Sequence, residues 1–96
     1  MTDLALRVQE AVCERFGIAR RELLAPSNRR VGFEPRAVGM LLMREAGESL
    51  SEIARTFRRD RATVRHALKA ILDVAPKRPK VTDAILDLRD ELYDED

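Results

Sequence analysis

Basic side chains crowd one short stretch of this 96-residue chain. From Arg55 to Lys69 the sequence holds six arginine or lysine residues and a single acid, Asp60. Cations this close repel one another unless an anion lies between them, and a nucleic-acid backbone is the natural polyanion. The stretch therefore predicts phosphate binding. The alternative is that these side chains form the solvated outer face of an amphipathic helix that binds nothing, and the periodicity leaves both interpretations open.

Two predicted helices position these cations. The first covers about 50–57, with Ser49 as its N-cap and Glu52 completing a capping box. The second begins after a good N-cap, Asp60. Their inward faces are apolar at helical spacing: Leu50, Ile53, Ala54 and Phe57 in the first, and Val64, Ala67, Leu68, Ile71 and Leu72 in the second. Because only residues 58–60 join them, we expect a sharp crossing, which is typical of a helix-turn-helix.

The remaining elements complete a small all-α bundle. Further helices are predicted over 3–16, 20–24, 35–46 and from Thr82 onward, with Thr2 or Asp3 capping the first and Gly17 ending it. Residues 25–34 read as a loop whose Phe33 folds back onto the core. Pro76 and Pro79 prevent a continuous helix before the last helix, which Thr82 is expected to cap. Ile85, Leu88 and Leu92 lie on one side of that helix, as expected for a face that covers the core.

Composition and charge narrow the class of protein. Hydrophobic residues make up 45% and aromatic residues 4%, with no tryptophan, which suits a helical bundle. No apolar run is long enough to cross a bilayer and no signal peptide is visible, so we expect a cytoplasmic protein. The net charge of +1 conceals an asymmetry. Residues 1–80 hold 17 lysines and arginines against 10 acids, whereas residues 81–96 hold one cation against seven acids. The chain therefore divides into a basic domain over 1–80 and an amphipathic helix with an acidic tail over 81–96.

Nothing in the sequence predicts catalysis. There is one cysteine and one histidine, no metal-ligand spacing and no glycine-rich phosphate loop. Cys13 reads as a buried, inert thiol. We therefore expect no enzyme activity, no catalytic residue, no metal, no cofactor and no nucleotide.

From Val8 to about Val74 the chain resembles the C-terminal DNA-binding domain of the bacterial chromosomal replication initiator DnaA. The resemblance is carried by VQEAVCERFGIARRELL, PRAVGMLLMREAGESLSEIARTF and DRATVRHALKAI. In that family the recognition helix opens with Asp-His-Thr-Thr-Val, and a second His follows two residues later. Asp60, Thr63, Val64 and His66 match this signature, while Arg61 and Ala62 replace His and Thr. The preceding turn is normally Gly-Gly-Arg and is the shorter Arg58-Arg59 here.

The resemblance implies a helix-turn-helix fold of the Trp-repressor and DnaA C-terminal type. It also implies sequence-specific binding of double-stranded DNA, in replication control or transcription regulation, and therefore a nucleoid-associated location. The residues expected to read bases in the major groove are Asp60, Arg61, Ala62 and Arg65. Those expected to contact phosphates or the minor groove are Asn28, Arg29, Arg30, Arg36, Ser51, Arg58, Arg59, Thr63, His66 and Lys69. Arginine paired with guanine is the commonest specific contact, so Arg61 can still read a base.

Two alternatives stay open at this stage. The chain could be a protein-interaction module that kept the fold and lost the DNA site, using its last helix to contact another protein. The acidic tail could also lie over the basic face and compete with DNA. For the origin of the chain we expect a freestanding small gene product, phage-borne or regulatory, with a domain excised from a longer chain as the alternative.

Overall fold

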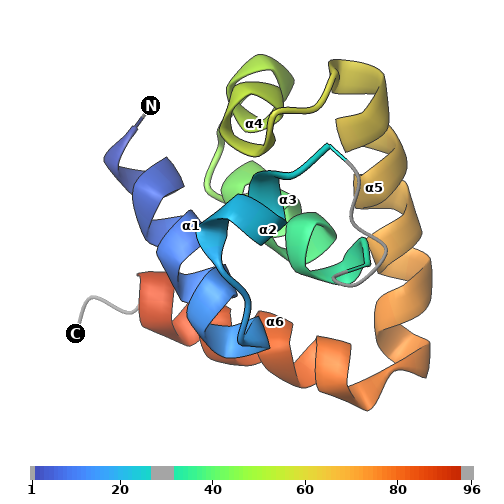
Figure 1. Cartoon of the computed structure of the whole chain (residues 1–96). Helices are drawn as coiled ribbons and strands as arrows, with labels where there is room; N and C mark the ends of the chain where they lie inside the picture. Colours follow the sequence, from blue (N-terminus) through green and yellow to red (C-terminus); the bar gives the residue numbers. More distant parts are fainter. Residues whose placement is uncertain (1, 27–31, 94–96) are drawn as a thin grey trace.

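Local capping signals set where the helices begin and end. The computed structural model describes residues 2–26 and 32–93, so the predictions for Asn28, Arg29 and Arg30 lie outside the described residues. The helices are α1 (Asp3–Phe16), α2 (Arg20–Leu24), α3 (Glu34–Glu45), α4 (Leu50–Phe57), α5 (Arg61–Val74), the 3₁₀ turn η1 (Ala75–Lys77) and α6 (Pro79–Tyr93), and the described part contains no strand (Figure 1). Thr2 accepts a hydrogen bond from the Ala5 N–H at 3.0 Å. Gly17 ends α1 with φ 66°, a left-handed conformation that suits glycine.

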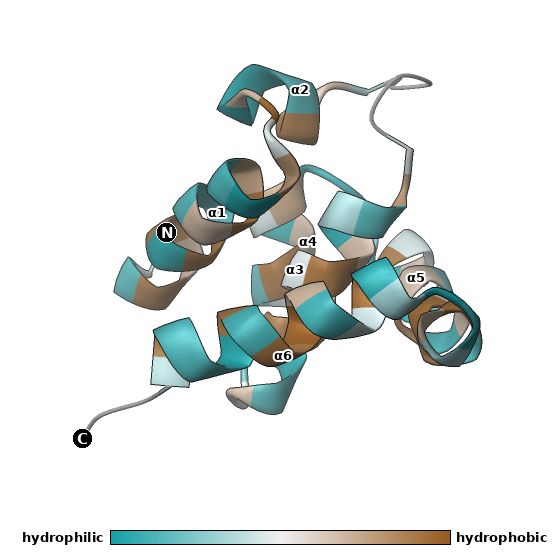
Figure 2. Ribbon diagram, turned by 90° about the horizontal axis from the view of Figure 1, so that it is seen from below, coloured by the Kyte–Doolittle hydropathy of each residue, from teal (hydrophilic) through white to brown (hydrophobic). Residues whose placement is uncertain are grey.

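Helix α3 lies at the centre of the molecule and packs against α1, α4, α5 and α6. Figure 2 shows the mostly brown, hydrophobic ribbon of α3 between α1, α5 and α6, which carry many teal, hydrophilic residues. The fully buried side chains include Val8, Val12, Leu23, Val38, Leu42, Met43, Ile53, Phe57, Val64 and Ile71. Gly39 allows α3 and α4 to approach closely, because a Cβ atom there would lie 2.6 Å from Cζ of Phe57. The all-α helix-turn-helix fold predicted from the sequence is confirmed.

Helix α6 closes the core from the other side. It buries Val81, Ala84, Ile85, Leu88 and Leu92, so its predicted apolar face is confirmed. Arg7 of α1 donates to the Leu92 carbonyl at 2.9 Å, and the Tyr93 hydroxyl donates to the Leu42 carbonyl of α3. The surface ion pairs Arg15–Asp87 and Arg89–Glu45 add two further links between α6 and its neighbours.

The predicted start of this last helix was wrong. Thr82 was expected to be its N-cap, but α6 begins at Pro79, since proline suits the first turn of a helix. Thr82 instead lies inside the helix, where its hydroxyl donates to the Ala75 carbonyl at 2.6 Å. The break predicted from the two prolines is confirmed, because η1 ends at Lys77 and Arg78 is extended.

Two side chains expected in the core are exposed. Phe33 is 42% exposed, because it stands at the N-cap of α3 and does not fold back. Leu72 is 63% exposed, because it lies one residue beyond the buried Ile71, on a flank of α5 that is open to solvent. With Leu86, which is 49% exposed, it borders an apolar groove of about 320 Å³ between the end of α5 and α6.

Candidate nucleic-acid interface

The turn between α4 and α5 is built from backbone hydrogen bonds. Arg58 takes the left-handed conformation, with φ 56° and ψ 46°, and its N–H reaches back to the last turn of α4. The Arg59 N–H donates to the Ala54 carbonyl at 3.0 Å. The Asp60 carboxylate then accepts from the Thr63 N–H at 2.7 Å and caps α5, as predicted. The chain thus reverses within three residues, and α4 and α5 pack against each other.

Helix α5 turns a continuous polar face away from the core. Figure 1 shows this helix at the edge of the molecule opposite α1 and the end of α6. The predicted site residues on this face are all exposed: Asp60, Arg61, Ala62, Thr63, Arg65, His66 and Lys69. Arg58 is exposed in the turn, and Ser51 is half-buried at the start of α4. The structure therefore brings the predicted base-reading residues together on the first turns of one helix.

The charge of Asp60 is stabilised by its role as a cap. The hydrogen bonds from Thr63 hold the pKa of this carboxyl below its ordinary value, and the charge of Arg65 lowers it further. Asp60 is therefore ionised near neutral pH. It remains accessible at the solvent edge of α5, so capping and contact with a ligand are compatible.

Glu52 does not complete the predicted capping box in the expected way. The Ser49 hydroxyl accepts from the Glu52 N–H at 3.1 Å, so the first half of the box is confirmed. The Glu52 carboxylate, however, pairs with Arg55 at 2.8 Å, and the hydrogen bond from Arg55 lowers the pKa of Glu52. Arg55 is thus neutralised locally, unlike the cations of α5.

Two of the predicted phosphate contacts face inward. Arg36 is only 7% exposed and donates to the Gly32 carbonyl at 3.0 Å, while its Nε has no hydrogen-bond partner among the described residues. Burial and the nearby charge of Arg59 lower the pKa of Arg36 to about 10. The predicted phosphate contact of Arg36 therefore lacks the exposed guanidinium that it requires.

Arg59 is half-buried and acts as a brace. It donates to the carbonyls of Phe57 and Arg58, each at 3.1 Å, and to the carbonyl of Ala25 at 2.6 Å. These bonds satisfy carbonyls at the end of α4 and tie the segment after α2 to the turn. The guanidinium of Arg59 is therefore largely occupied by the protein itself.

Sequence reasoning missed a buried amide that joins three helices. Gln9 of α1 is 1% exposed, and its Nε2 donates to the Thr56 carbonyl of α4 at 2.8 Å. Its Oε1 accepts from Nε of Arg20 in α2, also at 2.8 Å. The only signal of this buried amide in the sequence was the polar Gln9 between Val8 and the apolar residues 11 and 12. Because its partners lie far away in the sequence, that signal could not identify them.

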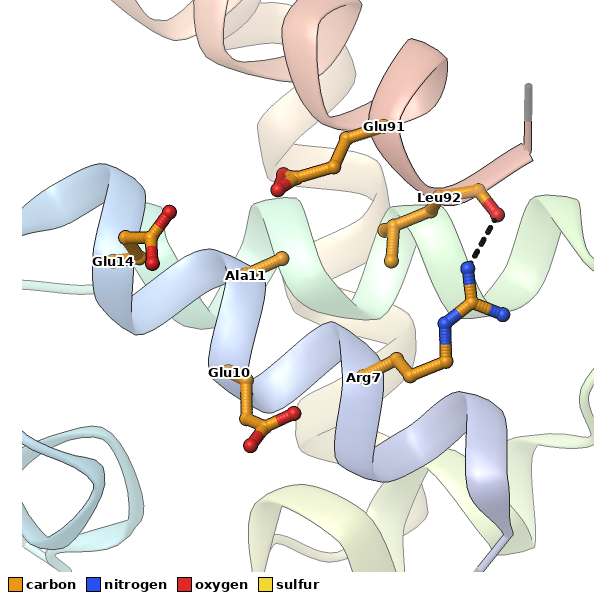
Figure 3. A pocket seen from close by; sticks show the side chains of 6 residues that line it. All are labelled: Arg7, Glu10, Ala11, Glu14, Glu91 and Leu92. Carbon is orange, nitrogen blue, oxygen red and sulfur yellow. Dashed lines mark hydrogen bonds between the residues drawn. The ribbon is translucent and has the colours of Figure 1, made fainter.

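A pocket on the side of the molecule opposite α5 has several acidic side chains in its lining. The pocket has a volume of about 370 Å³ and lies between α1 and α6. Its lining residues, drawn in Figure 3, are Arg7, Glu10, Ala11, Glu14, Glu91 and Leu92. The guanidinium of Arg7 turns to the Leu92 carbonyl rather than to a carboxylate. Three of the six residues that line this pocket are glutamates, whereas the exposed face of α5 carries Arg61, Arg65 and Lys69.

Groups for other chemistry are sparse in the described chain. Residues 2–26 and 32–93 contain no cluster of three or more His, Cys, Asp or Glu side chains that could hold a metal ion. Cys13 is half-buried, and burial raises the pKa of its thiol. Within the same ranges no helix is both long and apolar enough to span a lipid bilayer.

A short αL turn, a capped second helix and an outward polar face on that helix together define a helix-turn-helix module. The family of the bacterial DnaA protein helix-turn-helix matches residues 6–71. The chain belongs to this family.

Three chromosomal replication initiator proteins DnaA illustrate the relationship. The protein from Desulfotalea psychrophila is 35% identical over 69 residues, which cover 71% of this chain and 14% of the relative. The protein from Acinetobacter baumannii is 36% identical over 74 residues, which cover 75% of this chain and 16% of the relative. The protein from Thermomicrobium roseum is 34% identical over 90 residues, which cover 92% of this chain and 19% of the relative. The chain therefore spans less than a fifth of the length of these relatives.

Proposed function

We propose that this chain is a non-catalytic module that binds double-stranded DNA in a sequence-specific manner. Its relatives are chromosomal replication initiators, so we assign it to replication control, with transcription regulation as another use of the same contact. The observation that carries the proposal is the exposed face of α5. None of the ion pairs formed between described residues uses its cations Arg61, Arg65 and Lys69.

The first turns of α5 enter the major groove in this proposal, as the second helix of such motifs does. Arg61 and Arg65 are the candidates for hydrogen bonds to base edges, and Ala62 can contact a thymine methyl group. Asp60 can accept from a cytosine amine in addition to its capping bond. These four residues would determine which DNA sequence is bound.

A second set of residues would fix the register by binding phosphates. Among the described residues this set comprises Ser51, Arg58, Thr63, His66 and Lys69, while Arg59 supports the turn through its bonds to the Phe57, Arg58 and Ala25 carbonyls. Asn28, Arg29 and Arg30 remain the proposed minor-groove contacts.

Fluorescence anisotropy tests the proposal with the purified chain, an initiator-box duplex and a random-sequence duplex library. Binding that weakens with salt is expected, with a log–log slope of about 0.9 for each neutralised phosphate. Arg61→Ala should flatten sequence preference, whereas Lys69→Ala should weaken binding to every duplex alike. If the folded protein binds no duplex at low salt, the proposal is refuted and the protein-interaction alternative becomes the one to pursue.

A further inference from the structure

Three arginines meet at a recess beside the turn, and two of them have no part in the contacts proposed so far. The recess measures about 430 Å³ and is lined by Arg20, Arg21, Leu24, Ala25, Pro26 and Arg58. None of these six described residues is acidic. The ion pairs between described residues engage other cations, namely Arg15, Arg55, Arg78 and Arg89. Three arginines among the lining residues of one recess create a positive potential that favours an anion.

Arg20 is held in place by the buried amide of Gln9. The hydrogen bond from Arg20 Nε to Gln9 Oε1 is 2.8 Å long, and Gln9 is itself anchored on the Thr56 carbonyl. A guanidinium has five N–H donors, and this bond uses one of them. The remaining donors are therefore available on a side chain whose orientation is already fixed, which lowers the entropy lost on binding.

Arg58 occupies a backbone conformation that suits glycine better. It is the one non-glycine residue with positive φ in the described chain. An L-residue is strained there, because its Cβ approaches a backbone oxygen. Strain of this kind is tolerated where a side chain has a function, so the arginine at this position supports a role in binding.

Arg59 fixes the recess relative to α5. Its bond to the Ala25 carbonyl joins one wall of the recess to the turn, and Asp60 caps α5 at the next residue. An anion in the recess would therefore lie at a fixed position relative to the first turn of the recognition helix.

We propose that this recess receives one backbone phosphate of the bound duplex, at a position flanking the base pairs read by α5. The inference rests on the proposed function and adds Arg20 and Arg21 to the interface. Their contacts serve affinity and register rather than choice of sequence.

Salt-dependent binding of a double variant, compared with a control variant, measures the contribution of the recess to DNA affinity. Arg58→Gly suits the backbone of the turn, and Arg21 is exposed, so Arg21→Ala/Arg58→Gly is expected to remain folded. The double variant should bind roughly tenfold more weakly than the wild type, with a salt slope lower by about 0.9. Lys80→Ala, which removes an exposed cation at the start of α6, serves as the control and should leave the slope unchanged. If the double variant binds as tightly as Arg58→Gly alone, Arg21 takes no part and the inference is wrong.

Replacing the phosphates of the duplex one at a time with a neutral analogue identifies the phosphate that the recess binds. The duplex that binds most tightly is recovered from the random-sequence library. Each of its phosphates is then replaced in turn by methylphosphonate. One flanking substitution should weaken the wild type and have no further effect on the double variant. Equal sensitivity of both proteins at every position would overturn the recess while leaving the proposed function intact. No binding by the wild type at low salt would refute both.

Discussion

The strained turn allows stability and DNA binding to be separated with one residue. Arg58 has φ 56°, where an L-residue costs about 1–2 kcal/mol, and glycine avoids this cost. Glycine in turn loses about 0.5–1 kcal/mol more conformational entropy on folding. We therefore expect Arg58→Gly to raise the free energy of unfolding by roughly 0.5–1 kcal/mol. For a domain of this size that shift corresponds to an increase in Tm of about 3–6 °C.

The same substitution should weaken DNA binding, because it removes an exposed cation from the turn. The expected loss is about 1 kcal/mol, or roughly fivefold in Kd, since the side chain is solvent-exposed. Arg58→Ala is the matched control, because it removes the same guanidinium and keeps a Cβ in the left-handed conformation. Thermal melts followed by circular dichroism, together with anisotropy titrations, measure both effects. The glycine variant should melt higher than the alanine variant while both bind DNA equally weakly. Equal melting temperatures would refute the assignment of strain to this residue.

Three further predictions concern the supports of the turn. Gln9→Leu should lower the free energy of unfolding by about 1–3 kcal/mol, because it leaves the Thr56 carbonyl without its donor; an unchanged urea midpoint would show that another group satisfies it. Gly39→Ala should gain about 1 kcal/mol in helix propensity but lose more by clashing with Phe57, and the cost should shrink in a Phe57→Leu background. A more stable alanine variant in urea titrations would contradict this close packing. The lowered pKa of Asp60 means that its charge stabilises the fold above the ordinary carboxyl pKa, an effect lost as pH falls through the folded-state value. Asp60→Asn should therefore show a flatter dependence of the urea midpoint on pH between about pH 5 and 2, and parallel curves would contradict this.

The helix boundaries were predictable because their signals are local. Thr2, Gly17, Ser49 and Asp60 act on residues within one turn of themselves, so the sequence contains all the atoms that decide each cap. Thr82 shows the limit of this reasoning. It has the chemistry of a cap, but the preceding proline can itself open a helix, and the sequence does not rank the two.

Burial near the ends of helices was harder to predict. Periodicity identifies the apolar face of a helix, but another element must reach that face to cover it. Ile71 meets such a neighbour and Leu72 does not. The same limit applies to the site: the exposed residues of α5 follow from helical geometry, whereas the inward turn of Arg36 and the bond between Gln9 and Arg20 depend on tertiary packing.

The hydrogen bond between Tyr93 and α3 gives the molecule a built-in optical reporter. The sequence has no tryptophan and one tyrosine, so the near-ultraviolet emission comes from a single phenol. A peptide carbonyl that accepts from the hydroxyl quenches that emission, and burial raises the pKa of Tyr93, which delays formation of tyrosinate. Release of α6 from Leu42 would reverse both effects. The docking of the last helix can therefore be followed in the unlabelled protein, separately from events at the helix-turn-helix.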